Sequence, residues 1–111
     1  MQIRFASAKL EKVLSVEKTL NRTYGQKMAK RVKTGLAVLM AADDLTRVPT
    51  QGSIRCHQLS ADRDEQFAID LEHPRRLVFE VDQHPIPRLE DGGIDKAHVT
   101  RIVVTEIIDY H

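Results

Sequence analysis

Residues 66–81, QFAIDLEHPRRLVFEV, decide the fold of this chain, because two alternating apolar patterns flank a short polar link. Successive side chains of a β-strand point to opposite faces of a sheet, so this alternation indicates strands with one buried face. The link, EHPR, contains Pro74 and is typical of a tight turn. We therefore predict two strands joined by a turn, with Arg76 on the outward face. The predicted inward residues are Phe67, Ile69, Leu71, Leu77, Phe79 and Val81.

Two helices and further strands are predicted around this pair. Apolar residues recur at helical spacing over 8–24, after Ser7 as a helix cap, and over 26–41, with Gly25 between the two segments. Gly35 lies inside the second helix and weakens it by about 1 kcal/mol relative to Ala. The remaining predicted strands are QIRFA at 2–6, SIRCHQL at 53–59 and VTRIVVTEIIDYH at 99–111, of which the last is the strongest.

The order of these elements, with helices grouped before most strands, predicts an α+β domain. An N-terminal helical hairpin would pack on an antiparallel β-sheet, and 111 residues suit one domain over 1–111. No apolar run approaches the roughly 20 residues that cross a membrane, and no signal peptide is expected. The single Cys56 excludes an internal disulfide and suits a reducing cytoplasm. The scattered His residues show no metal-ligand spacing, so we expect no metal and no other cofactor.

The charges are unevenly distributed along the chain. Residues 1–40 contain nine Lys or Arg against two acidic residues, a net charge of +7, whereas residues 41–111 have a net charge of −6. This asymmetry is compatible with a polyanion or an acidic protein as partner. It is equally compatible with amphipathic helices that carry lysines on their solvated face.

The chain ends on Asp109, Tyr110 and His111, three side chains that can take part in acid–base chemistry. If Ile108 points to the core, Tyr110 follows it, and Asp109 and His111 share the opposite face with Ile107. Arg76 would lie on that face, and His57 of the 53–59 strand could join it. The alternative is that residues 109–111 form a solvated tail, that His57 is an ordinary half-buried strand residue, and that Arg76 only pairs with a neighbouring carboxylate.

Such a group of side chains suits metal-free cleavage of RNA. A base must take the 2′-hydroxyl proton, an acid must protonate the departing 5′ oxygen, and a cation must stabilise the charged transition state. Imidazole can serve either proton role near neutral pH, and each role contributes roughly 10²–10⁴-fold. Arginine stays charged and its forked donors suit a phosphate.

The segments RCHQL, DRDEQFAIDLEHPRRLVFE and the terminal DYH together resemble the RelE/ParE superfamily of toxins, in particular its HigB-like branch of killer proteins. The resemblance extends over nearly the whole chain, from IRFA through the basic helices and the H-x-L and R-L-x-F strands to the DYH ending. No single motif is specific, but their order and the length of the chain agree with this superfamily.

This resemblance implies the toxin of a type II toxin–antitoxin module, and HigB-like members cleave mRNA in the ribosomal A site. The implied partners are mRNA, the ribosome and a cognate antitoxin, which is often a helix-turn-helix protein. The toxin would contact DNA only indirectly, through this antitoxin. No membrane partner is expected. The implied catalytic residues are His57, Arg76, Asp109, Tyr110 and His111. The residues expected to bind RNA or the ribosome are Lys27, Lys30, Arg31, Lys33 and Arg63.

The sequence departs from this family after the strand histidine. Relatives often read H-x-L-K-G-D-R-K-G, whereas this chain reads HQLSADRDE, with Ser60 at a lysine position and Asp64 and Glu65 where a basic residue and a glycine are common. Anions beside a phosphodiester site oppose RNA binding. The second hypothesis is therefore a non-catalytic binding protein on the same scaffold, either an inhibitor of DNA gyrase, as ParE-like relatives are, or a degenerate toxin that only pairs with its antitoxin.

Overall fold

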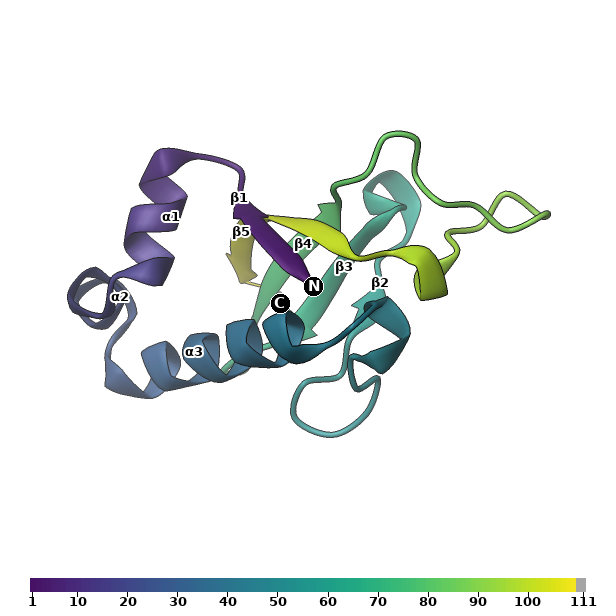
Figure 1. The fold of residues 1–111 in the computed structure, drawn as a ribbon. Coiled ribbons are helices and arrows are strands. Elements are labelled where there is room, and N and C mark those ends of the chain that lie inside the picture. The colour runs from purple at the N-terminus through teal and green to yellow at the C-terminus, as the bar shows by residue number, and fades with distance from the viewer. Residues whose placement is uncertain (110–111) are drawn as a thin grey trace.

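The two strands predicted at 66–81 form the middle of a five-stranded sheet in a computed structural model that describes residues 1–109 (Figure 1). The order across the sheet is β1-β5-β4-β3-β2. Neighbouring strands are antiparallel except β1 and β5, which pair in parallel at one edge. The strands are β1 (Gln2–Phe5), β2 (His57–Gln58), β3 (Gln66–Asp70), β4 (Arg75–Val81) and β5 (Arg101–Asp109).

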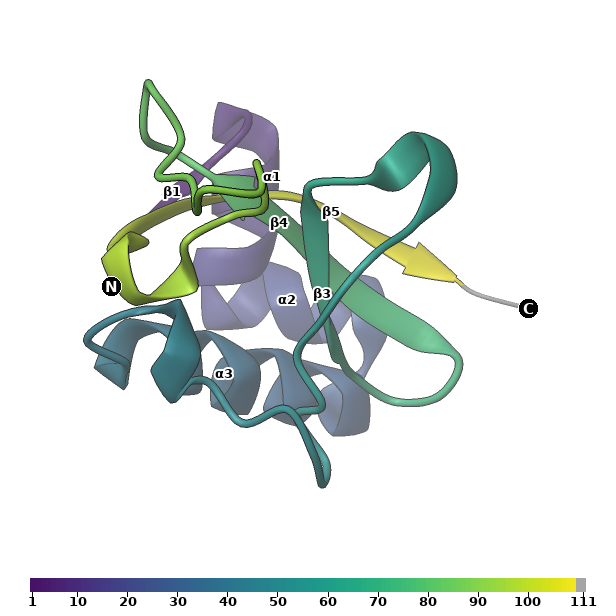
Figure 2. The same cartoon turned by 90° about the vertical axis from the view of Figure 1, so that its right-hand side faces the viewer.

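Helices cover one face of this sheet. They are α1 (Ala8–Ser15), α2 (Glu17–Tyr24) and α3 (Gln26–Ala41), with short 3-10 turns η1 (Leu45–Arg47), η2 (Ala61–Arg63) and η3 (Lys96–His98) in the connections. Figure 2 shows the helices on one side of the strands and the segment around η2 on the other. The predicted α+β architecture, a helical layer on a mostly antiparallel sheet, is confirmed.

The prediction of one continuous helix over 8–24 is wrong, because Val16 has an extended backbone between α1 and α2 (φ −100°, ψ 116°). The Thr19 hydroxyl donates a hydrogen bond of 2.6 Å to the carbonyl of Lys12, which supplies a carbonyl near the end of α1 with a donor. The predicted N-cap is confirmed, because the Leu10 amide at the start of α1 donates a hydrogen bond of 3.1 Å to the Ser7 hydroxyl. The predicted helix end is also confirmed, because α2 ends before Gly25, which has a φ of 82°.

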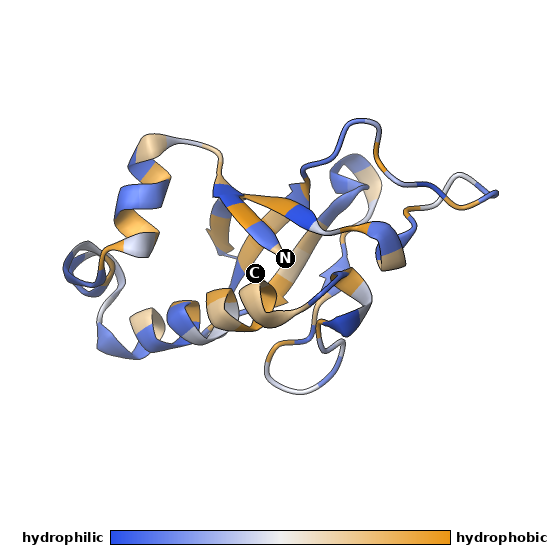
Figure 3. Cartoon of the chain, in the orientation of Figure 1, coloured by the Kyte–Doolittle hydropathy of each residue, from blue (hydrophilic) through white to orange (hydrophobic). Residues whose placement is uncertain are grey.

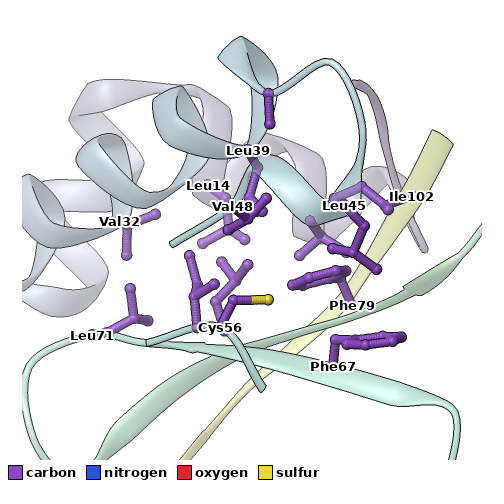
Figure 4. Close-up of a cluster of buried hydrophobic side chains, with 14 of the residues drawn as sticks. Leu14, Val32, Leu39, Leu45, Val48, Cys56, Phe67, Leu71, Phe79 and Ile102 are labelled. Carbon is purple, nitrogen blue, oxygen red and sulfur yellow. The ribbon is translucent and has the colours of Figure 1, made fainter. Parts of the chain in front are cut away.

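The hydrophobic core lies between the helices and the inward face of the sheet (Figures 3 and 4). All six residues predicted to point inward from β3, β4 and the link between them are buried in it. The rings of Phe67 and Phe79 stack with their centroids 5.7 Å apart and their planes 17° apart. Figure 4 shows these rings beneath helix residues such as Leu39, with Cys56 between the two layers.

Gly35 lies on the face of α3 that packs against Ile69 of β3. A Cβ atom built on it would lie 2.6 Å from Cδ1 of Ile69, which is fully buried. Gly35→Ala is therefore expected to lower the free energy of unfolding by about 1 kcal/mol, because overpacking of roughly 1–3 kcal/mol outweighs the gain in helix propensity. Urea unfolding measures the change, and Thr34→Ala, which is exposed on the same helix, is the control and should not destabilise. A Gly35→Ala variant more stable than the wild type would contradict this packing argument.

Strand β5 contains a β-bulge that determines which side chains share a face. Val78 pairs with Glu106 whereas the next residue, Phe79, pairs with Val104, so Thr105 is the extra residue. The Thr105 hydroxyl donates to the Val78 carbonyl at 3.2 Å. An extra residue reverses the alternation beyond it. The expectation that Ile108 points to the core is consequently wrong, because Ile107 packs against the core and Ile108 lies on the outer face.

Candidate functional site

His57 and Arg76 meet on the outer face of the sheet, the face predicted for Arg76. Nη1 of Arg76 lies 3.5 Å from Nε2 of His57, at the outer limit of a hydrogen bond. Both side chains are half-buried. Beside them, a small apolar cluster of Leu59, Ala68, Val78 and Ile108 forms the floor of this face.

The backbone before His57 fixes the tautomer of its ring. Nδ1 of His57 lies 2.8 Å from the carbonyl oxygen of Arg55. Because a carbonyl oxygen only accepts, Nδ1 carries the proton in the neutral ring, and the lone pair of Nε2 is directed toward Arg76. Arg55 adopts a φ of 43°, a left-handed conformation that costs about 1–3 kcal/mol in residues other than glycine.

Asp70 holds two arginines of the site with one carboxylate. Its oxygens accept from Nε and Nη2 of Arg55 at 2.7 and 3.1 Å, and one lies 3.5 Å from Nε of Arg76. The hydrogen bond and the charge of Asp70 raise the pKa of Arg55, which stays cationic. Two guanidinium groups thus share one carboxylate beside His57.

Asp70 and Arg55 were missed as site residues in the sequence. The register of the β3–β4 pair places Asp70 directly opposite Arg76. The tight turn and the alternation of this hairpin therefore contained the signal that Asp70 and Arg76 are neighbours. Arg55 gave no comparable signal, because its position depends on a loop conformation.

The structure does not bring Asp109 to this face by its strand register. Asp109 pairs with Arg75, beside Ile107, whereas Arg76 pairs with Ile108. The predicted sharing of one face by Asp109 and Arg76 is therefore wrong, because the bulge at Thr105 moves Asp109 to the other side. Tyr110 and His111, the other two C-terminal candidates, lie outside the described residues.

The three helix lysines predicted to bind RNA differ in their surroundings. Lys27 Nζ lies 3.5 Å from a carboxylate oxygen of Glu72, and Lys33 Nζ lies 2.9 Å from one of Glu17. Lys30 is exposed on α3. Such exposed ion pairs contribute little stability, about 0–1 kcal/mol, so a polyanion could replace either carboxylate at small cost.

Arg31, which was predicted to bind RNA or the ribosome, also has a structural role. Its Nη2 donates to the carbonyls of Ser53 and Leu71, each at 3.1 Å. These bonds tie α3 to the 49–56 segment and to the turn after β3. Charge-assisted bonds to carbonyls hold the guanidinium in place while leaving its charge uncompensated.

One carboxylate of the acidic segment after His57 is paired with an arginine, Arg88, whereas Arg63 of the segment binds side chains outside it. Arg63 donates to Gln66 at 2.9 Å and to Glu106 at 3.3 Å. Arg88 binds Glu65 through both of its terminal nitrogens, with Nη2 to Oε1 at 3.2 Å, and this bond together with the charge of Arg88 lowers the pKa of Glu65. The ion pair also ties the 82–97 segment to the loop that follows the strand histidine.

Cys56, next to His57, is a buried thiol rather than a nucleophile. Burial raises its pKa from the ordinary value of 9.0 to about 11, although Lys96 acts in the opposite direction. A thiol with a high pKa is a weak nucleophile because the thiolate is the reactive form. Cys56 therefore packs in the core and takes no part in the acid–base chemistry of the outer face.

The raised pKa of Cys56 predicts a loss of stability at alkaline pH. The unfolded thiol ionises near pH 9 and the folded thiol near pH 11. Below pH 9 the protonated thiol makes its whole contribution to the free energy of unfolding. This contribution, roughly 2–3 kcal/mol, is lost as the pH rises from 9 to 11. Urea unfolding from pH 8 to 11 measures it, with Cys56→Ala as the control. If both proteins showed the same pH dependence, Cys56 would not be its cause.

No group of three or more His, Cys, Asp or Glu within residues 1–109 could hold a metal ion. None of the helices described there is long and apolar enough to cross a membrane.

Comparison with known proteins found a similarity at the level of the fold. No family model and no curated protein matched the sequence. Among solved structures, the chain is similar to a YoeB/ParE toxin from Agrobacterium tumefaciens, with 13% sequence identity, a TM-score of 0.57 and coverage of 100% of both chains. At that identity the likeness concerns the fold, and it spans every element described above. The chain therefore has the α+β fold of a RelE/ParE-like toxin.

Proposed function

We propose that this chain is the toxin of a type II toxin–antitoxin module, of the HigB-like branch, and that it cleaves mRNA on the ribosome without a metal ion. The observation that carries the proposal is the contact between Arg76 Nη1 and His57 Nε2, 3.5 Å apart on the face that the helices leave open. The fold shared with a YoeB/ParE toxin supports the toxin assignment. The chain would act in the cytoplasm and be neutralised by its antitoxin.

The tautomer of His57 favours the role of general base. The lone pair of Nε2 would take the proton of the 2′-hydroxyl, whose oxygen then attacks the adjacent phosphorus atom. Arg76 would stabilise the added negative charge with its forked donors. His111 would return a proton to the departing 5′ oxygen, which leaves a 2′,3′-cyclic phosphate on one product. Asp70 would act as a positioning residue, because it holds Nε of Arg76 while Nη1 faces His57.

The remaining candidates have supporting roles in this proposal. Tyr110 would stack on a base or orient the phosphate. Asp109 would orient an imidazole other than His57, since the Arg55 carbonyl already fixes the His57 ring. Lys30 and the neighbouring cations of α3 would contact the RNA backbone, whose phosphates attract any exposed cation.

A non-catalytic binding protein on the same scaffold is the second candidate. The observation that favours it is the pairing of predicted RNA-binding cations with carboxylates of the chain, such as Lys33 with Glu17 and Arg63 with Glu106. Such a protein would block a target such as DNA gyrase, or would only pair with its antitoxin.

His111→Ala separates these two functions. A nuclease would lose growth inhibition and mRNA cleavage but keep its fold and its affinity for the antitoxin. A gyrase blocker would remain toxic, since it does no proton transfer. The measurements are growth after induction, mapping of transcript ends and co-purification with the antitoxin. Growth arrest by the unaltered chain with every transcript intact would end the nuclease proposal.

A further inference from the structure

A basic hollow adjoins the candidate site at the turn between β3 and β4. It has a volume of about 440 Å³, and its lining includes Arg31, Arg55, Arg75 and Arg76. Asp70 is the one carboxylate in the lining that the structure describes. The hollow therefore holds an excess of positive charge, and its volume lies in the range of roughly 300–1,000 Å³ that is typical of small-molecule sites.

Each of these arginines is held in place by contacts within the protein. Arg31 is held by two carbonyls, and Arg55 and Arg76 share the carboxylate of Asp70. Arg75 lies over an aromatic ring, with its guanidinium carbon 5.7 Å from the centroid of Tyr24. A cation–π contact orients a guanidinium without neutralising it. Fixed cations around a hollow suit a phosphate, which arginine binds with paired hydrogen bonds.

Arg76 connects this hollow to the candidate site, because it lines the hollow and also contacts His57. We propose that the hollow binds the phosphate next to the scissile one on the same RNA strand, with Arg75 and Arg55 as its main contacts. This inference rests on the proposed function. A strand with its scissile phosphate at Arg76 would continue past the β3–β4 turn, and the hollow offers space for a nucleotide there.

Arg75→Gln tests the proposal without touching His57 or Arg76. Its matched control is Arg101→Gln, the same change at an exposed arginine where β5 begins. The probe is a six-nucleotide RNA with 2′-O-methyl riboses, which binds but cannot be cleaved through its 2′ oxygens. Fluorescence anisotropy over a range of salt concentrations gives the affinity and its salt dependence.

Arg75→Gln should weaken binding about 5- to 10-fold and reduce the slope of log K against log salt by about 0.7, the value for one phosphate contact on a single strand. Arg101→Gln should leave both quantities within error of the wild type. Replacing one phosphate of the RNA with a neutral methylphosphonate, position by position, should weaken wild-type binding at the phosphate in the hollow. The same replacement should have no further effect on Arg75→Gln.

Arg75→Lys keeps the charge and the contact with the ring, so it should retain the salt slope and lose only part of the affinity. Thermal unfolding verifies that each variant is folded. Equal binding by the Arg75→Gln and Arg101→Gln variants would overturn the proposal.

The failure of this inference differs from the failure of the proposed function. If ribosomes with this protein yield cleaved mRNA while binding is independent of Arg75, the hollow is not a subsite and the nuclease stands. If binding depends on Arg75 but no mRNA is cleaved, the phosphate site stands and the nuclease does not.

Discussion

His57→Asn is expected to slow mRNA cleavage on the ribosome by about 10²–10⁴-fold, the range that one general base contributes. The asparagine amide can still donate to the Arg55 carbonyl, which accepts from His57 Nδ1 at 2.8 Å in the wild type. What is lost is the lone pair of Nε2 beside Arg76. The fold and the affinity for an antitoxin should therefore remain.

Single-turnover cleavage on purified ribosomes measures this effect, with the antitoxin affinity determined on the same preparation. His84→Asn is the control, because His84 is exposed in the 82–97 segment, which follows the end of β4 away from Arg76. It should cleave at the wild-type rate. A His57→Asn variant that also cleaves at the wild-type rate would show that another group removes the proton.

Phe79→Ala should lower the free energy of unfolding by about 3–5 kcal/mol, the usual cost of deleting a buried aromatic ring. Phe79 is fully buried in β4, between β3 and β5, and its ring stacks on that of Phe67. The substitution removes this contact and leaves a cavity in the layer where the helices meet the sheet. A domain of this size has only about 5–15 kcal/mol of stability in total, so much of the variant could be unfolded at 37 °C.

Urea unfolding followed by circular dichroism measures the loss. Phe5→Ala is the control, since Phe5 lies at the end of the edge strand β1 and is only half-buried. Its loss should be clearly smaller. If Phe79→Ala cost less than about 1 kcal/mol, the cavity would have to collapse onto neighbouring side chains, and the stacked pair would not be the centre of the core.

The central hairpin was predictable because burial imposes a local pattern. The residues predicted to point inward from 66–71 and 75–81 are all in the core, and the strands β3 and β4 begin and end within one residue of the predicted ranges. Two-residue alternation survives tertiary contacts wherever one face is covered. The same pattern placed Arg76 outward, and it could have placed Asp70 opposite it.

Features that depend on contacts distant in sequence were not predictable. Nothing local indicates that β1 pairs in parallel with β5, or that Val16 interrupts the first helix. From the sequence, Gly35 was expected only to destabilise its helix, because glycine has a low helix propensity. The structure shows in addition that Ile69 fills the space that a Cβ atom at this position would need. The position of Arg55 depends on a loop with a positive φ.

The single extra residue in β5 also has a consequence for evolution. Loss of Thr105 would remove the bulge, yet residues 106–109 would keep their partners in β4 and therefore the faces that they occupy now. A one-codon deletion at this point would thus straighten the strand without exchanging side chains between the two faces, whereas a shift of the pairing by one residue would exchange them all. When chains of this architecture are aligned, the residues after the bulge should be matched through their partners in β4, because counting from the start of β5 is off by one residue in a chain that lacks the bulge.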